Sequence, residues 1–361
     1  MKMVQPIDET IEKLAKETRV AIDDYDDTVH AIIGFVNLYL LDDTYQQRPE
    51  VKGFQGRRLM PLSLEQEPIE SKVDHYVTPD LGVVIEGKKG ILGEVQKNFP
   101  KDDTERGMKV FGQLRGYDQD LIGWPVASKK VESHEIVLLV HLTTSVLAKD
   151  FYEQKLQKKG IAFKHPFSIV EFSRFEQMQE FFLFRAVLGE PTEIGGEGKL
   201  KFGVPVPMRV FLHEYAKIKL YDAQPPVPYL AVLIWTHIVT PIASENPSFE
   251  HLRKNQKIEV TLAIDDVVDE LNEGFSFHFW HGEYPELQPR IPHKEWVREA
   301  CQFLVDSGEG KWLEGSNNTK LVIFYHQRYR DIREQFVLSH AELEGQKLEA
   351  PMFPGFELKA S

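Results

Sequence analysis

The sequence is short of cysteine, of positive charge and of long apolar runs. Cys301 is the only cysteine, so no internal disulfide can form, and a reducing cytoplasm is the expected compartment. The N-terminus lacks the apolar core of a secretory signal, and no run of about 18 apolar residues is present. These absences predict a cytoplasmic protein without a membrane partner.

The shortage of positive charge limits how the chain can meet nucleic acid. Its formal net charge is -13, and a protein that coats nucleic acid through a uniformly basic surface needs clustered lysine and arginine. A localised binding site is still compatible with this charge. The chain also lacks the glycine-rich loop that cradles phosphates in ATP-driven enzymes.

Helical and strand patterns alternate through the first half of the chain, which is typical of an α/β domain. Two helices are expected within residues 7–41, a β-hairpin within 76–97 and a helix at 104–119. The strand "HEIVLLVHL", a helix closed by Gly160, the strand "FSIVEFS" and a helix over "EQMQEFFLFRAVLGE" are expected to follow. Residues 1–188 are therefore predicted to form one domain.

The second half of the chain has a different texture. The glycine- and proline-rich stretch 189–205 has no hydrophobic period and marks the predicted domain boundary, and a region with mixed signals follows it. Residues 189–226 are therefore predicted to connect two domains. Residues 227–343 are predicted to contain three helices followed by a β-hairpin, which is a winged-helix pattern. Residues 344–361 are expected to form a loosely held tail.

Two carboxylates can meet across the predicted hairpin. Asp80 begins one strand and Glu94 lies on its partner, so the two side chains can face each other. Because successive residues of a strand point to opposite faces, Gln96 shares the face of Glu94, whereas Val95 and Lys97 point the other way. This arrangement is a metal site in outline, with a glutamine beside the carboxylates.

The helix that follows adds a second pair of polar residues. Gln113 and Tyr117 are four positions apart and share one helix face. In order and spacing, "TPD" at 78–80, "EVQ" at 94–96 and "QLRGY" at 113–117 resemble the PD-(D/E)XK nuclease superfamily and its RecB-like branch with a Gln-x-x-x-Tyr motif. The resemblance covers roughly residues 7–175, and it departs at the glutamine, where the family usually has lysine.

The resemblance implies a restriction-endonuclease-like core, in which helices flank a mixed central sheet, and a magnesium-dependent hydrolysis of phosphodiester bonds in DNA. Asp80, Glu94 and the main-chain carbonyl of Val95 would bind Mg²⁺ or Mn²⁺. Gln96 would orient the attacking water without supplying the positive charge of a lysine.

The family resemblance also suggests roles for residues outside the strands. Gln113 and Tyr117 would contact substrate or steady the metal-bound strand, although a structural pair on the helix surface explains them equally well. The family usually has a further acid in its first helix, and Glu12 is the candidate here. A solvated helix face is the alternative explanation for Glu12.

Basic residues gather around the predicted C-terminal hairpin, where Glu314 is the lone acid. Phosphate contacts require such a local excess of positive charge. Winged helices also dock proteins, so a partner protein or a second copy of this chain is the alternative occupant. The hypothesised DNA-binding residues are Lys97, Lys311, Lys320, Arg328 and Arg330.

The leading hypothesis is a metal-dependent endonuclease or exonuclease that acts on DNA in defence against foreign DNA or in mobile-element processing. One alternative is a catalytically inactive subunit in which the nuclease fold binds DNA or protein. Another is a transcription regulator whose winged helix dominates.

Overall fold

The chain divides into two compact units. The sheet unit comprises residues 26–223 and 273–290, and the helical unit comprises residues 1–25, 224–272 and 291–361. These boundaries differ from the predicted ones, because the first residues belong with the C-terminal part of the chain. The computed structural model describes residues 9–40, 51–56, 60–61, 76–85, 89–101, 104–124, 131–175, 181–191, 199–207, 224–252, 256–273, 292–326 and 331–349.

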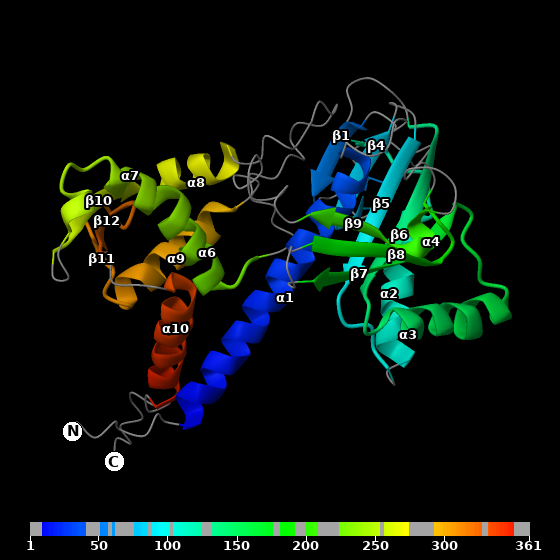
Figure 1. The fold of residues 1–361 in the computed structure, drawn as a ribbon, viewed down its shortest axis with the longest axis horizontal. Coiled ribbons are helices and arrows are strands. Elements are labelled where there is room, and N and C mark those ends of the chain that lie inside the picture. The colour runs from blue at the N-terminus through cyan, green and yellow to red at the C-terminus, as the bar shows by residue number, and fades with distance from the viewer. Residues whose placement is uncertain are drawn as a thin grey trace, which may run out of the picture. The chain divides into compact units, whose positions relative to one another are not determined.

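A seven-stranded mixed sheet forms the centre of the sheet unit, in the order β1-β4-β5-β6-β7-β8-β9 (Figure 1). β5, β6 and β7 run parallel, and the other neighbours are antiparallel. Helices join the parallel strands, as parallel pairing requires, so this unit is α/β, as its alternating patterns predict. Its elements are β1 (Val51–Gly56), β2 (Met60–Pro61), β3 (Tyr76–Val77), β4 (Leu81–Ile85), β5 (Lys89–Gln96), α2 (Thr104–Tyr117), β6 (Ser133–His141), α3 (Ser145–Phe151), η2 (Tyr152–Leu156), η3 (Gln157–Lys159), β7 (Phe167–Phe175), β8 (Phe181–Leu188), α4 (Lys199–Phe202) and β9 (Val204–Pro207).

Helices cover both faces of this sheet. Phe111 and Leu114 of α2 and Ala148 of α3 share one apolar core with alternate residues of β6. On the opposite face lies the second half of α1 (Glu9–Leu40), where the ring of Phe35 meets the ring of Phe184 edge to face, with the ring centroids 6.1 Å apart. The two faces of the central strands therefore meet different partners.

The first helix corrects the predicted pair of helices, because α1 is continuous through the acidic stretch "DDYDD". Its carboxylates are neutralised by partners on other elements: Arg333 binds Asp23, and Lys97 binds Asp27. Arg174 lies 3.6 Å from Asp26. Acids that look like a helix break in the sequence are thus held inside a helix by ion pairs.

Two further predictions near residue 190 are wrong. The helix expected over "EQMQEFFLFRAVLGE" is strand β8, whose Phe182 and Phe184 are fully buried, as suits aromatic residues on a sheet. The predicted connection 189–226 contains α4 and the edge strand β9. Pro205 and Pro207 are compatible with that strand because an edge position leaves backbone donors unpaired on one side.

The helical unit contains a small antiparallel sheet in the order β10-β12-β11. The expected helices and C-terminal hairpin are present, whereas β10 and α10 were not predicted. Residues 344–349, assigned to the tail, belong to α10. The elements are α6 (Val227–Ile234), η4 (Trp235–Val239), α7 (Thr240–Ser244), η5 (Phe249–His251), β10 (Ile258–Ala263), α8 (Ile264–Glu273), α9 (Lys294–Asp306), β11 (Gly310–Trp312), β12 (Lys320–Tyr325) and α10 (Ile332–Glu349).

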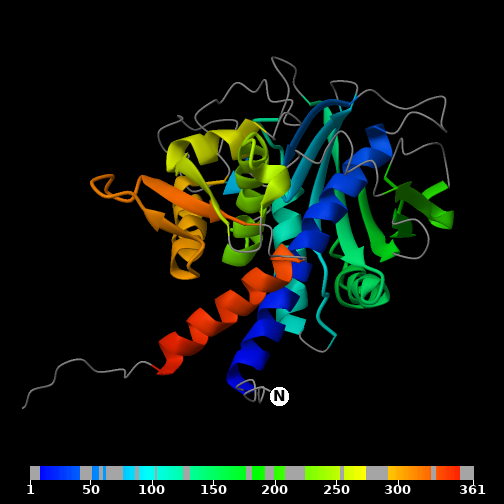
Figure 2. The ribbon, with the colours of Figure 1, turned by 60° about the vertical axis from the view of Figure 1, so that its left-hand side comes forward.

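The first half of α1 packs against α10 within this unit (Figures 1 and 2). Ala15 and Ile22 share a small core with Val337 and Ala341. A hydrogen bond of 2.9 Å from the Arg19 guanidinium to Glu334 borders this core. These contacts explain why α10 is an ordered helix rather than a loose tail.

One helical stretch in the described part of the chain, Val227–Ser244, is long and apolar enough to cross a membrane, and 44% of it is buried inside the protein. A core helix of a water-soluble protein meets the same criterion. Leu230, Ala231 and Ile234 are fully or almost fully buried in the unit, which accounts for the apolar composition of the stretch.

Candidate functional site

The β4–β5 hairpin brings Asp80 and Glu94 together. Its register pairs Leu81 with Gly93, so the next position along the hairpin places Asp80 opposite Glu94. Both acids are buried, with 3% and 8% of their surface exposed. The Oδ2 atom of Asp80 accepts a hydrogen bond of 2.8 Å from the main-chain N–H of Val95, which fixes the aspartate against the neighbouring strand.

Helix α2 supplies two neutral donors to Glu94. The side-chain amide of Gln113 donates to Glu94 Oε1 at 2.7 Å and to the Tyr117 hydroxyl oxygen at 3.0 Å. The Tyr117 hydroxyl lies 2.5 Å from Glu94 Oε2 and 3.0 Å from the main-chain oxygen of Thr78. The hydroxyl has one hydrogen, and the shorter contact with the charged acceptor is the stronger one.

These contacts keep Tyr117 protonated. Burial raises the pKa of Tyr117, and the charge of Glu94 and its hydrogen bond raise it further. The hydroxyl is therefore a permanent donor to the glutamate. A carboxylate oxygen has two lone pairs, so each oxygen of Glu94 can accept one hydrogen bond and still bind a second partner.

Gln96 ends strand β5 and is partly exposed. Its amide donates to the main-chain oxygen of Asn98 at 3.2 Å, within its own turn. The pairing of β5 with β4 and β6 runs without a register shift, so the strand has no bulge that would redirect the residue after Gln96. The alternation of the strand thus puts Gln96 on the face of Glu94.

Two lysines of the described residues near the site, Lys89 and Lys97, are bound elsewhere. Lys97 lies 2.6 Å from Asp27 of α1, on the sheet face opposite to α2. Arg174 lies 3.9 Å from the same aspartate. Lys89, at the other end of β5, lies 2.9 Å from Glu135. Lys97 therefore contributes to a protein ion-pair cluster in this structure, and its predicted contact with DNA would require it to leave Asp27.

The remaining predicted site residues lie outside this network. Glu12 is exposed and belongs to the helical unit, whereas Asp80 and Glu94 belong to the sheet unit. Lys311 and Lys320 are exposed on the small sheet of the helical unit. The two predicted arginines, Arg328 and Arg330, fall outside the described residues.

The donor atoms in the site suit a hard cation. Mg²⁺ is commonly held by one or two carboxylates, with water and substrate phosphate completing its shell. Asp80, Glu94 and the carbonyl of Val95 provide oxygen donors of this kind. Among the described residues, no group of three or more His, Cys, Asp or Glu side chains could hold a metal.

Sequence reasoning missed three residues that support α2. His134 binds the main-chain oxygen of Tyr117, and His165 binds Asp118. Asp118 directly follows Tyr117, which is the only sequence signal that could have drawn attention to it. The two histidines come from a strand and a loop, and no pattern in the sequence links them to the helix.

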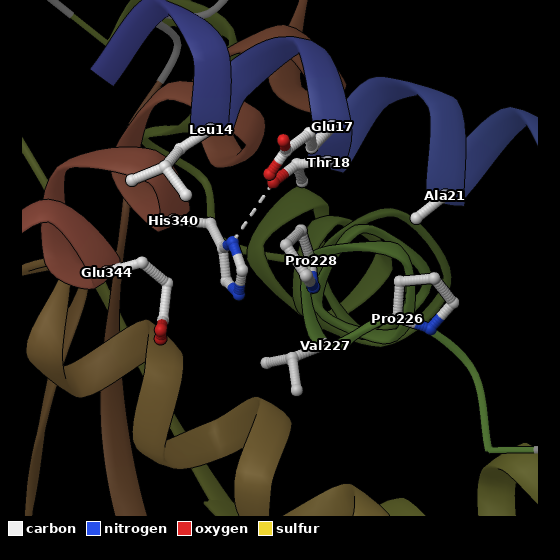
Figure 3. Close-up of a pocket in the computed structure, with 9 residues that line it drawn as sticks. All are labelled: Leu14, Glu17, Thr18, Ala21, Pro226, Val227, Pro228, His340 and Glu344. Carbon is white, nitrogen blue, oxygen red and sulfur yellow. Dashed lines mark hydrogen bonds between the residues drawn. The ribbon is translucent and has the colours of Figure 1, made fainter. Parts of the chain in front are cut away.

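The helical unit has a separate pocket of about 300 Å³ (Figure 3). Its walls are mostly apolar, and His340 lies 3.3 Å from Thr18 across it. Its charged lining residues are Glu17 and Glu344. A pocket bordered by carboxylates repels phosphate, so this pocket does not fit a nucleic-acid backbone.

Searches against protein-family models, curated proteins and solved structures found no match to this chain.

Proposed function

We propose that the sheet unit is a metal-dependent deoxyribonuclease of the PD-(D/E)XK type, with a restriction-endonuclease-like core. The observation that supports this most directly is the register of β4 and β5, which sets Asp80 against Glu94. The placement of Gln113 and Tyr117 on Glu94 adds the helix motif of the RecB-like branch to the same point. The sheet order β1-β4-β5-β6, with α2 between its last two strands, suits such a core.

In this proposal Asp80, Glu94 and the carbonyl of Val95 hold Mg²⁺ or Mn²⁺. When bound, the ion stabilises charge on the phosphate and lowers the pKa of a water. Gln113 and Tyr117 fix the orientation of the Glu94 carboxylate, in the way that outer hydrogen bonds orient metal ligands.

Gln96 orients the attacking water through its amide. To do so it must leave the oxygen of Asn98, a contact of 3.2 Å at a partly exposed site. Because an amide brings no positive charge, we expect slow catalysis, since losing one preorganised contact to a transition state costs on the order of 10²–10³ in rate. The biological setting we propose is defence against foreign DNA or mobile-element processing.

The test is cleavage of supercoiled and linear DNA with Mg²⁺ or Mn²⁺ by the full chain and by Asp80→Ala. Asp27→Asn serves as the control, because it removes a carboxylate from the opposite face of the same sheet. We expect metal-dependent cleavage by the wild type and by Asp27→Asn, and its loss in Asp80→Ala. Equal cleavage by the wild type and Asp80→Ala would exclude this site as its source.

A second candidate function is a catalytically inactive scaffold of the same fold. Two observations favour it: both oxygens of Glu94 already accept hydrogen bonds from α2, and the Gln96 amide turns toward Asn98. If the protein is such a scaffold, we expect no binding of Mn²⁺ at Asp80 and no cleavage of DNA with either metal. Calorimetric titration of Mn²⁺ into the wild type and Asp80→Ala separates the two functions.

For the helical unit we propose a winged-helix module that contacts DNA. Its order α7-β10-α8-α9-β11-β12 and its sheet order β10-β12-β11 suit that fold. The ammonium groups of Lys257 and Lys311 lie 4.9 and 5.8 Å from the centre of the Phe324 ring, so two positive charges gather at one place on the sheet. Glu259, the partner of Phe324 across the sheet, reduces this charge.

DNA binding by this surface should weaken as salt rises, because each lysine that meets a phosphate releases a counterion. We expect Lys257→Ala with Lys311→Ala to reduce affinity and to lower the slope of log affinity against log salt by about 2. Lys347→Ala, which removes an exposed lysine of α10, is the matched control. An unchanged salt slope would instead favour docking of a partner protein.

A further inference from the structure

We propose that His134 is a positioning residue for the candidate site, which sets where the Tyr117 hydroxyl meets Glu94. This inference rests on the proposed metal-dependent function of the sheet unit. His134 touches neither the carboxylates nor the space between them in the described contacts. Its role is exerted through the last turn of α2.

The contact is a hydrogen bond at the end of a helix. The Nε2 atom of His134, on β6, lies 2.7 Å from the main-chain oxygen of Tyr117. Tyr117 is the last residue of α2, and the last carbonyls of a helix have no partner within the helix. His134 is buried, with 5% of its surface exposed, so this bond is shielded from water.

Neighbouring rings hold the imidazole of His134 in place. The ring of His165 stacks on it with centroids 3.8 Å apart and planes 26° apart, and the Trp124 ring lies at 5.6 Å. His165 is itself anchored, because its Nδ1 lies 3.0 Å from Asp118 Oδ1. His134 therefore has little freedom to follow a displaced helix end.

Asp118 ties the same turn to a second segment. Its carboxylate accepts the main-chain N–H groups of Lys164 and His165, at 2.8 to 2.9 Å, in the loop before β7. Two consecutive residues, Tyr117 and Asp118, are thus bound to β6 and to this loop. The C-terminal end of α2 is therefore held by two different segments, in addition to the contacts that its side chains make in the site.

Tyr117 is consequently held at both ends. Its carbonyl is bound by His134 on β6, and its hydroxyl is bound to Glu94 on the adjacent strand β5. A slip of the helix end would move the hydroxyl away from the carboxylate. Outer groups that orient metal ligands typically contribute 10- to 100-fold in metal affinity, so the bond to His134 should be visible in metal binding.

The bond requires a hydrogen on Nε2, which the carbonyl of Tyr117 selects because it can only accept. Burial keeps this imidazole neutral by lowering the pKa of His134 to about 4. The ring of His165 beside it also lowers the pKa of His134. A neutral Nε2–H donor is therefore the state that holds the helix end near neutral pH.

The experiment measures Mn²⁺ affinity by calorimetry in the full chain and three variants. His134→Ala removes the donor, His134→Gln keeps an amide donor, and Val137→Ala removes buried methyl groups from the same strand without touching α2. We expect about 10-fold or greater weakening for His134→Ala, recovery of most of that affinity in His134→Gln, and no change in Val137→Ala despite its lower stability.

The outcomes separate the two proposals. If the wild type binds no Mn²⁺, the proposed function fails and this inference fails with it. If the wild type binds Mn²⁺ and His134→Ala binds it equally well, only the positioning role is overturned. If His134→Ala does not fold, His134→Asn replaces it, because its amide is too short to reach the carbonyl, and unchanged affinity in that variant overturns the positioning role.

Discussion

The two faces of strand β5 hold their acids in different ways. On the α2 face, Glu94 is buried and bound by the neutral donors of Gln113 and Tyr117. On the α1 face, Asp27 meets the cations of Lys97 and Arg174 at 2.6 and 3.9 Å, with about a fifth of the aspartate side chain exposed. One strand thus separates a dipolar environment from an ionic one.

This difference indicates which face serves the fold and which serves chemistry. A mostly buried ion pair anchors a helix to a sheet, and its net contribution to stability is modest because the cost of desolvation offsets the attraction. A buried carboxylate must be satisfied by hydrogen-bond donors, and a hydrophobic residue would fill that position at lower cost. Buried acids kept in this way are candidates for functional sites. Substitutions that alter one face at a time test this contrast.

The largest effect is expected from Glu94→Gln. This change keeps the shape of the side chain but removes the charge that the metal requires, so cleavage should fall by on the order of 10²–10³. Asp27→Asn makes the equivalent change on the α1 face and should leave the rate within about 3-fold. The comparison is made in single-turnover assays with Mn²⁺. If the cleavage rate fell equally in both variants, the two faces would not differ in their importance for catalysis.

The sequence predicted the residues of the α2 face better than those around it. Period-two alternation separated Gln96 from Lys97, and helical spacing joined Gln113 to Tyr117, because both rules are local. The ion pairs of Asp27 come from long-range packing of α1, and no local pattern shows that "DDYDD" meets cations on other elements. The aromatic run in β8 fits both a helix and a buried strand, and only its place in the sheet decides between them.

The second-largest effect is expected in the pH dependence of stability, through His134, which holds the end of α2. Folding lowers the pKa of His134 from 6.5 to about 4. Between these values the unfolded chain binds a proton that the folded chain does not, so stability should fall as the pH drops from 6.5 to 4, by up to about 3 kcal/mol. Below pH 4 both states bind the proton, and this contribution stops changing.

His134→Gln should remove that part of the pH dependence, as measured by urea unfolding across the same range. His165, Asp118 and Asp120 also face this ring, and their charges act on it. The difference between the wild type and the variant therefore reports the local group rather than the other titrating residues. Parallel stability curves in the two proteins would contradict the buried neutral state of His134.

A smaller effect is expected from Tyr117→Phe. Without the hydroxyl, Glu94 Oε2 loses its donor and the Gln113 amide loses an acceptor, which should lower the free energy of unfolding by about 1–3 kcal/mol. Tyr152→Phe makes the same chemical change at a mostly buried tyrosine on the same side of the sheet. A loss in Tyr152→Phe as large as that in Tyr117→Phe would show that the Glu94 contacts contribute nothing special.

The smallest effect belongs to the ionic face. Asp27→Asn weakens the contact with Lys97 but keeps an amide oxygen that can accept its hydrogen bond, so the loss should not exceed about 1 kcal/mol. About a fifth of each side chain is exposed, so salt screens the pair in part. A double-mutant cycle with Lys97→Met isolates the pair from the contact of Arg174 with the same acid. We expect a coupling that shrinks as salt rises. A coupling above about 3 kcal/mol that does not change with salt would mean that the α1 face is as shielded from solvent as the α2 face. The two faces would then differ only in the groups that bind their carboxylates, cations on one and neutral donors on the other.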